Sequence, residues 1–132
     1  MIVVDASALV AIADQEPEAE LYLGVIERAT RAVISPMNAV EAAIVLIGRP
    51  RFAGAEDFDL WLKSLSVEID TSPGDYAGAM AAYLAFGRGY HAARLNLGDS
   101  FAYALAKKLD APLLYKGIDF TLTDLRPALQ PT

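Results

Sequence analysis

The stretch Ile2-Val3-Val4-Asp5-Ala6-Ser7-Ala8-Leu9-Val10-Ala11-Ile12-Ala13 decides the fold class of this chain. It begins with a compact β-branched run, residues 2–4, which is typical of a buried strand in a parallel sheet. An acid follows at once, and residues 7–13 then have the composition of a helix. The same order of strand and helix recurs further along the chain, so the stretch predicts an α/β domain.

Short apolar runs and helical patterns alternate through the rest of the chain. Further strands are predicted at residues 32–34, 67–69, 112–115 and, as a short last strand, near 123–125. One helix is predicted to begin at Glu16-Pro17-Glu18, and a longer one runs from Pro36 towards Ile47. Three more are predicted: one over about residues 55–65, one from Ser72-Pro73-Gly74-Asp75 through Ala85, and one from Ser100 to about Leu109. We expect a single α/β domain over residues 1–132, with three layers and a mainly parallel central sheet flanked by helices.

The composition limits the kinds of metal site that the chain can form. The 132 residues include no Cys and one His, which excludes disulfides, thiolate zinc sites and His-rich metal sites. Any bound metal ion must therefore be held mainly by oxygen atoms. The longest wholly apolar stretch, residues 42–47, is far shorter than the roughly 20 residues that span a bilayer, and the first residues contain no basic leader. We expect a cytoplasmic protein without a membrane segment.

The net charge limits the kind of nucleic-acid binding. With 11 Lys and Arg against 17 Asp and Glu, the formal net charge is −6, which excludes strong non-specific coating of DNA. If four of the acids are gathered in one pocket, however, the remaining surface is nearly balanced in charge. The composition is therefore compatible with a pocket that processes RNA.

Four acids stand at positions that favour a common site. Asp5 directly follows the first strand, and Asp119 follows the strand at residues 112–115. In open α/β sheets the ligand crevice lies at these carboxyl ends. Asp99 stands at the entrance of a helix, where exposed N–H groups favour negative charge. Glu41 lies in an otherwise apolar helical stretch with no Lys or Arg near it in sequence, and a buried carboxylate needs a partner or a cation.

Three or four carboxylates in one pocket repel one another, so they cannot all stay ionised without compensation. A hard divalent cation provides it, because Mg²⁺ prefers oxygen ligands and keeps several of its waters. Bound Mg²⁺ or Mn²⁺ lowers the pKa of a water molecule and stabilises charge on a phosphoryl oxygen. Since the chain has no cysteine nucleophile, this set of residues favours metal-assisted hydrolysis of a phosphodiester bond.

Four motifs occur in a recognisable order along essentially the whole chain. They are Met1-Ile2-Val3-Val4-Asp5-Ala6-Ser7, Asn38-Ala39-Val40-Glu41, Leu97-Gly98-Asp99-Ser100-Phe101-Ala102-Tyr103-Ala104-Leu105-Ala106 and Leu114-Tyr115-Lys116-Gly117-Ile118-Asp119-Phe120. Each motif is weak alone, but the ordered set is fairly specific. By these motifs the sequence resembles the PIN-domain ribonucleases, and within them the VapC toxins of bacterial toxin–antitoxin pairs.

The resemblance implies roles for particular residues. The acidic metal-binding and catalytic set would be Asp5, Glu41, Asp99 and Asp119. Ser7 and Asn38 would orient carboxylates or waters. The family implies Mg²⁺- or Mn²⁺-dependent cleavage of RNA by a homodimer, neutralised by a VapB-type antitoxin whose tail lies across the active-site groove. The family often has Asn before the fourth acid, where this chain has Ile118.

Basic residues near these motifs are candidates for contact with RNA phosphates. We expect this role for Arg88 and Arg94, and for Lys116 beside the proposed pocket.

Simpler functions remain open for the acids. Asp5 and Asp99 could cap their helices, and Asp119 could be a turn residue beside Gly117. A phosphoacceptor signalling domain is disfavoured, because no second acid adjoins Asp5. The principal alternative to an RNA hydrolase is a non-catalytic PIN-like module that binds nucleic acid or protein.

Overall fold

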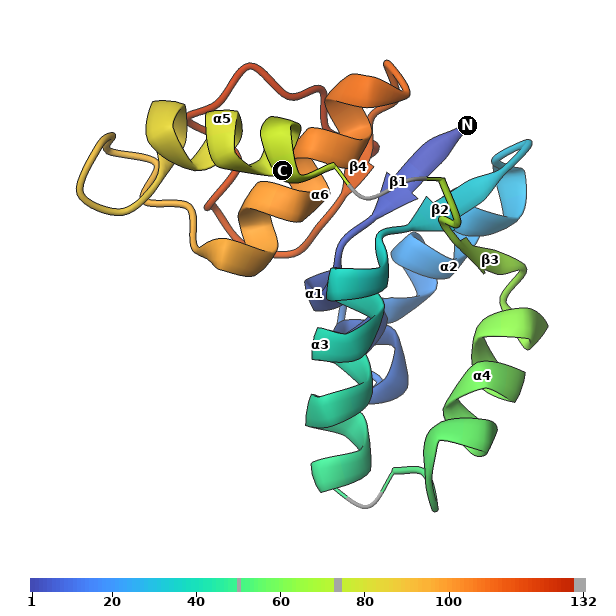
Figure 1. Ribbon diagram of the computed structural model, residues 1–132. Coiled ribbons are helices and arrows are strands. Elements are labelled where there is room, and N and C mark those ends of the chain that lie inside the picture. Colours follow the sequence, from blue (N-terminus) through green and yellow to red (C-terminus); the bar gives the residue numbers. More distant parts are fainter. Residues whose placement is uncertain (50, 73–74, 130–132) are drawn as a thin grey trace.

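A computed structural model describes residues 1–49, 51–72 and 75–129 (Figure 1). Its strands are β1 (Ile2–Val4), β2 (Ala32–Ile34), β3 (Val67–Ile69) and β4 (Leu113–Leu114). Its helices are α1 (Ala6–Ala13), α2 (Ala19–Arg28), α3 (Pro36–Gly48), α4 (Ala55–Ser64), α5 (Tyr76–Phe86) and α6 (Leu97–Lys108). Two helices separate each of these strands from the next. None of the helices within the described ranges combines the length and the apolar character needed to cross a membrane.

The first strand lies inside the sheet, whose strand order is β3-β2-β1-β4. All three pairings are parallel, with Val3 opposite Val33 on one side and opposite Leu113 on the other. Every side chain of β1 is buried, as a β-branched run in a strand covered on both faces requires. The carboxyl ends of the strands therefore share one edge of the sheet, where the crevice of an open α/β sheet lies.

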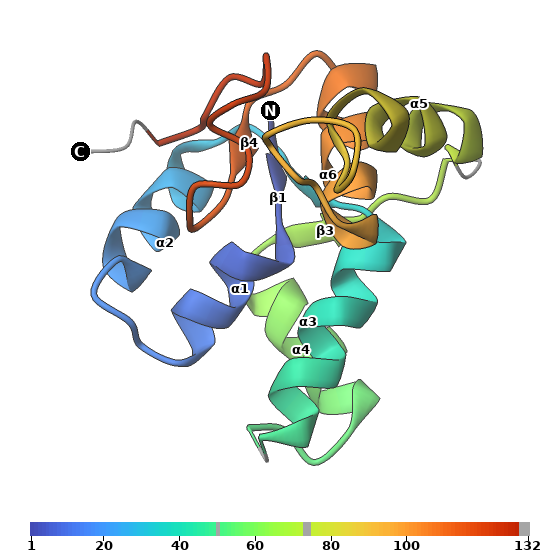
Figure 2. The ribbon, with the colours of Figure 1, turned by 90° about the vertical axis from the view of Figure 1, so that its left-hand side faces the viewer.

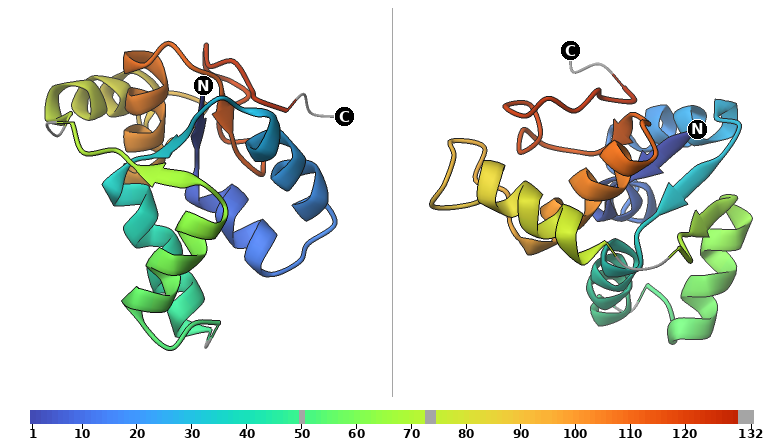
Figure 3. Two further views of the ribbon diagram at one scale, coloured as in Figure 1. Left: turned by 90° about the vertical axis from the view of Figure 1, so that its right-hand side faces the viewer. Right: turned by 45° about the horizontal axis from the view of Figure 1, so that its top comes forward.

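Alternation along the strands separates two hydrophobic cores. Val4 and Ile34 belong to a core with residues of α1, α2, α3 and α4. Val3 and Val33 belong to a second core with residues of α6, against which α5 packs. Figures 2 and 3 show helices on both faces of the sheet. The prediction of a three-layer α/β domain with a mainly parallel central sheet is confirmed.

The last predicted strand, near residues 123–125, is wrong. The chain forms turns there and then meets β4 in a single parallel bridge between Leu113 and Pro127. The N–H of Leu113 donates to Arg126 O at 2.9 Å, and the N–H of Ala128 donates to Leu113 O at 2.8 Å. The N–H that proline lacks would point away from β4, because Arg126 and Ala128 supply the groups that bond to Leu113, so Pro127 is compatible with this bridge.

Two helices begin at residues other than the predicted ones. The helix predicted to open at Pro17 begins only at Ala19, and Pro17 lies in the turn before it. Helix α6 begins at Leu97, before the predicted Ser100, because the side chain of Asn96 caps it.

The helix predicted from Ser72-Pro73-Gly74-Asp75 is present as α5, with Asp75 as its N-cap residue. The Asp75 side chain accepts the N–H of Gly78 at 2.8 Å. Pro73 and Gly74 lie outside the described residues, as does Pro50 after α3.

Candidate active site

Asp5 stands at the carboxyl end of β1, where the strand turns into α1 (Figure 1). Its Oδ2 accepts the backbone N–H of Ser7 at 3.1 Å and the Ser7 hydroxyl at 2.6 Å. The residue is only 5% exposed. Asp5 is therefore the N-cap of α1 and, at the same time, a buried carboxylate at the open edge of the sheet.

Ser7 joins α1 to the loop that follows β4. The backbone N–H of Lys116 donates to Ser7 Oγ at 2.9 Å, while the Ser7 hydroxyl gives its one proton to Asp5. The loop that carries Asp119 is thereby anchored beside Asp5. Both hydrogen bonds together fix the Ser7 hydroxyl and, through it, the orientation of the Asp5 carboxylate.

Asn38 is fully buried and links α3 to α6. Its side-chain NH₂ donates to Glu41 Oε1 at 2.7 Å and to the carbonyl oxygen of Gly98 at 3.0 Å. Its Oδ1 accepts the hydroxyl of Ser35 at 2.5 Å. Because the amide has a partner on each side, its orientation is fixed, and it holds the Glu41 carboxylate against the first turn of α6.

Asp99 is the third residue of α6, and it caps the helix from that position rather than as the N-cap residue. Asn96 is the N-cap: its side chain accepts the N–H of Asp99 at 2.8 Å. In return, Asp99 Oδ2 accepts the N–H of Asn96 at 3.0 Å. The pair forms a capping box, which fixes the Asp99 carboxylate. Asn96 is not among the predicted site residues, although the Asn-x-x-Asp spacing indicates a capping box.

Burial and mutual repulsion raise the pKa values of three of the acids. Burial raises the pKa of Asp5 to about 6 against the hydrogen bonds from Ser7, and the charge of Glu41 adds to the rise. Burial raises the pKa of Asp99 to about 6 as well, and the charges of Asp5 and Asp119 contribute. Burial and the charge of Asp99 raise the pKa of Glu41. The four carboxylates, from β1, α3, α6 and the loop after β4, therefore lie within electrostatic reach of one another.

The loop after β4 turns at Gly117, whose φ of 104° favours glycine. Asp119 follows two residues later and is exposed, as is its neighbour Ile118. Because the charge of Asp119 acts on Asp99, this turn residue also belongs to the acidic cluster. It is the outermost of the four acids.

No basic side chain in the described ranges forms an ion pair with these four acids. Nor do those ranges contain three His, Cys, Asp or Glu side chains arranged to hold one metal ion. One or two carboxylates with several waters are, however, the ligand set that Mg²⁺ usually takes from a protein, and Mn²⁺ suits the same donors. The donors fit a largely hydrated divalent ion rather than one enclosed by protein.

The loop between α5 and α6 presents two of the basic residues predicted to contact RNA. Arg88 and Arg94 are both exposed and line one shallow hollow with Tyr90 and His91. The N–H of Arg88 donates to Leu95 O at 3.0 Å and closes the base of the loop. The fold thus brings the two arginines together immediately before the first turn of α6.

Lys116, the third predicted RNA contact, is paired with acids of its own chain. Its Nζ lies 3.1 Å from Glu18 Oε2 and also pairs with Glu16. A shallow cleft of about 370 Å³ between α1 and α3 is lined by Lys116 together with Ser7, Glu41 and Arg49, among others. Arg49 is not among the predicted site residues, and no local pattern indicates it, because the end of α3 reaches this cleft only in the folded protein.

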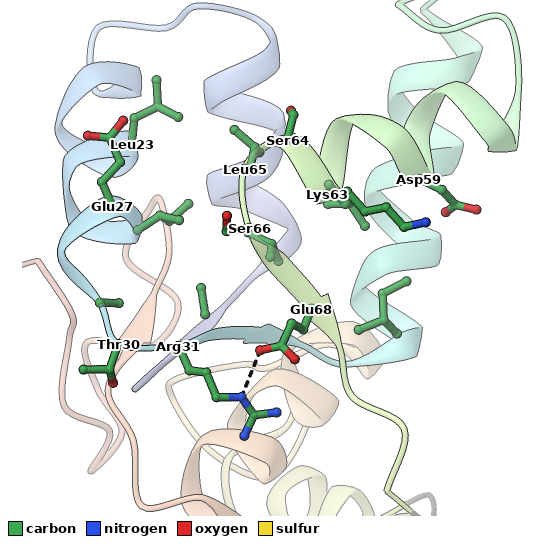
Figure 4. A pocket seen from close by; sticks show the side chains of 16 residues that line it. Leu23, Glu27, Thr30, Arg31, Asp59, Lys63, Ser64, Leu65, Ser66 and Glu68 are labelled. Carbon is green, nitrogen blue, oxygen red and sulfur yellow. Dashed lines mark hydrogen bonds and ion pairs between the residues drawn. The ribbon is translucent and has the colours of Figure 1, made fainter.

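A cavity of about 950 Å³ lies elsewhere, between α2, α4 and the β2–β3 edge (Figure 4). Leucine side chains line its wall, and Arg31 and Glu68 form an ion pair of 2.9 Å at its side. None of the four acids lines it. The clustered charges, and not the size of a cavity, therefore identify the candidate active site.

Comparisons with known proteins identify the family of this chain and proteins that share its fold. A family model described as the PIN domain matches residues 2–124. A ribonuclease VapC of Mycolicibacterium smegmatis is 44% identical over 94% of this chain and 97% of its own. Ribonuclease VapC30 of Mycobacterium tuberculosis is 40% identical over 98% of this chain and 100% of its own. The crystal structure of M. tuberculosis VapC20, described as a sarcin–ricin loop cleaving toxin, matches with a TM-score of 0.76 at 16% identity, over 99% of this chain and 100% of that one, and shows the shared fold.

Proposed function

Because the chain belongs to the PIN domain family and, within it, to the VapC ribonucleases, we propose that Asp5, Glu41, Asp99 and Asp119 form the centre at which it hydrolyses RNA. The protein is a toxin-type endoribonuclease. The observation that carries the proposed site is the raised pKa of Asp5, Glu41 and Asp99, which come from three separate elements, together with the charge of Asp119 acting on Asp99. Perturbed titratable groups of this kind are concentrated at functional sites.

The proposed centre takes Mg²⁺ or Mn²⁺. Asp5 and Asp99 are the two most buried of the acids and would hold the ion, with Glu41 and Asp119 beside them. When bound, such an ion lowers the pKa of a water ligand and stabilises charge on a phosphoryl oxygen. Its charge also offsets the repulsion among the carboxylates.

The neighbouring polar groups keep these acids in place. Ser7 orients Asp5, Asn38 orients Glu41, and the capping box with Asn96 orients Asp99. Each of these donors binds a carboxylate oxygen and so favours the ionised form, which is the form that binds a cation. We assign Ser7 and Asn38 to positioning rather than to the chemical step.

Arg88 and Arg94 are the proposed phosphate contacts on the α6 side of the acids. The guanidinium fork suits phosphate oxygens, and both side chains are exposed. Lys116 and Arg49 would contribute on the α1–α3 side. There the RNA phosphates would replace the acids that these two side chains now contact.

Cleavage of RNA by the purified protein is expected to require added Mg²⁺ or Mn²⁺. A chelator should stop cleavage, and Mn²⁺ in excess should restore it. The ion should also stabilise the folded state, by about 2.7 kcal/mol at one hundred times its Kd. Mapping of cleaved ends in total RNA and thermal unfolding with and without Mn²⁺ measure both effects. Undiminished cleavage in the chelator would exclude the metal-dependent mechanism.

The alternative of a non-catalytic PIN-like binding module fits the same fold. It predicts no RNA cleavage and no need for a divalent ion. The buried acids argue against it, because charges buried without a cation weaken a fold. Titration calorimetry separates the two: an absence of Mn²⁺ binding at millimolar concentration would favour the module.

As a VapC-type ribonuclease the protein acts on RNA, and we propose that it is paired with a VapB-type antitoxin. We propose that the protein and its antitoxin lie in the cytoplasm, where the RNA is. A tail of the antitoxin across the acids would block RNA, and cleavage assays with and without the antitoxin test this arrangement.

We further propose that the protein forms a homodimer through an apolar surface on α3, α5 and α6. The exposed apolar side chains of this surface are Val40 and Ile44 on α3, Tyr76, Met80 and Leu84 on α5, and Leu97 on α6. Helix α6 contacts both α3 and α5, so the three helices adjoin. Exposed apolar side chains gathered on adjoining helices are typical of a protein–protein interface.

Replacing Met80 and Leu84 together with glutamate is expected to convert the dimer into a monomer, because charged side chains would have to be buried in the interface. Analytical ultracentrifugation should give twice 14.1 kDa for the wild type and 14.1 kDa for the variant. Leu21→Glu on α2, which is 58% exposed on another face, is the matched control and should stay dimeric. A monomeric wild type at assay concentrations would refute the proposal.

A further inference from the structure

Gly98, the second residue of α6, is buried beneath the carboxylate of Glu41. A β-carbon at position 98 would lie closer than 3.0 Å to both carboxylate oxygens and to the carboxyl carbon of Glu41. Such distances are far inside van der Waals contact. An alanine at this position and the present Glu41 carboxylate therefore cannot occupy the same space.

The backbone itself does not require glycine here. Among the described residues, the glycines with positive φ are Gly89 and Gly117, and Gly98 is not one of them. In an ordinary helical conformation alanine is favoured over glycine. Glycine at position 98 thus opposes the local helix preference, and the approach of Glu41 is what accounts for it.

The same contact joins the two helices that carry Glu41 and Asp99. The Asn38 side chain donates to Glu41 Oε1 and to Gly98 O, so one amide bridges the acid and the backbone on which it rests. Asp99 is the next residue along α6, and its charge acts on Glu41. The space left empty at Gly98 therefore determines how closely the Glu41 carboxylate approaches Asp99.

We propose that Gly98 is a positioning residue of the active site: its missing side chain forms the seat for the Glu41 carboxylate between Asn38 and the first turn of α6. The position of Glu41 follows from the contacts alone, while its effect on cleavage rests on the proposed function. In Gly98→Ala the flexible end of Glu41 moves away, so the fold is retained and the hydrogen bond from Asn38 is lost.

The first test needs neither metal nor RNA. In NMR spectra of the metal-free protein, Gly98→Ala should shift the side-chain NH₂ signals of Asn38, because the bond to Glu41 is broken. Gly48→Ala is the matched control, since a β-carbon there meets nothing within 4 Å. In a Glu41→Ala background, Gly98→Ala should shift the Asn38 signals much less than it does in the wild-type background, and an equal shift in both backgrounds would overturn the proposal. Unchanged Asn38 signals in Gly98→Ala would overturn the proposal.

The second test measures Mn²⁺ affinity by calorimetry and RNA cleavage on the same proteins. Gly98→Ala should weaken Mn²⁺ binding by about 10- to 100-fold, as the loss of an orienting contact does at metal sites, and lower kcat with it. Gly48→Ala should match the wild type. In the Glu41→Ala background the second substitution should leave the affinity unchanged, and a further loss there would overturn a role through Glu41.

The two tests separate this inference from the proposed function. If the wild type neither binds Mn²⁺ nor cleaves RNA, the proposed function fails, and the Asn38 signals still decide whether Gly98 seats Glu41. If the wild type does both and Gly98→Ala equals it in affinity and cleavage, the positioning role is overturned while the nuclease stands.

Discussion

Asp5→Asn is expected to lower RNA cleavage by roughly a thousandfold and, at neutral pH, to raise the stability of the metal-free fold. The loss of activity follows from the lost charge. A bound divalent ion contributes several kcal/mol of transition-state stabilisation, and each 1.36 kcal/mol is a tenfold change in rate. An uncharged amide at the centre of the acidic cluster forfeits most of that contribution.

The gain in stability arises because the substitution removes a buried negative charge that destabilises the metal-free fold. The pKa of Asp5 is raised from 3.8 to about 6 because the ionised carboxylate is buried and faces Glu41. Two pH units correspond to about 3 kcal/mol of unfavourable free energy for the charged form at neutral pH. Asparagine removes the charge and, as a good N-cap residue, can still accept the N–H of Ser7.

The matched control is Asp75→Asn. Asp75 also caps a helix through a backbone N–H, but it lies on α5, away from the acidic cluster. The Asp75→Asn protein should cleave RNA at the wild-type rate. Cleavage rates and urea unfolding in a chelator measure both quantities. An Asp5→Asn protein that cleaves normally, or one that loses activity only because it unfolds, would contradict the argument.

The metal-free protein should also become more stable as the solution is acidified from about pH 7 to about pH 5. The folded pKa of Asp5, about 6, stands above its model value of 3.8, so between these values the folded state binds a proton that the unfolded chain does not. The stability that this proton uptake contributes is complete below the pKa of the unfolded chain, and it is lost as the pH rises through the folded pKa of about 6. Asp99 acts in the same direction.

The exposed acids oppose this trend only weakly. Arg31 lowers the pKa of Glu68, and Tyr103 and Lys107 lower that of Asp124, which gives the usual loss of stability in acid. Both pairs are exposed and contribute little.

Urea unfolding across this pH range in a chelator measures the effect, and Asp5→Asn should flatten the curve. With Mn²⁺ present the trend should reverse, because the ion binds the deprotonated acids. A free energy of unfolding that falls steadily from pH 7 to pH 5 in the chelator would refute the assignment.

The order of strands and helices could be predicted because its signals are local. The run at residues 2–4 and the Ser35-Pro36 cap before α3 depend on neighbouring residues alone. The bridge between Leu113 and Pro127 does not, since it arises when the end of the chain packs beside β4. Short alternation near residues 123–125 therefore predicted a strand that the tertiary structure does not form.

The acids of the site were recognisable one by one, but their supports were not. Glu41 attracts notice in an apolar helix, and Asp5 at a strand end. That Asn38 would donate to Gly98 O, 60 residues away, depends on how α3 approaches α6. The same holds for the empty space at Gly98 and for the Lys116 ammonium group, whose partners come from the connection between α1 and α2. Residue type and spacing do not predict such long-range contacts.

The strand order has a consequence for how the toxin is made. Strand β1 is synthesised before β4, and it becomes an interior strand only when β4 arrives to cover its free side. A chain interrupted before Leu113 would keep β1 as an open edge, prone to aggregation and degradation, and would lack Asp119 altogether. Truncated translation products are therefore expected not to cleave RNA, so that toxicity to the cell would begin only once β4 and the loop after it have been made.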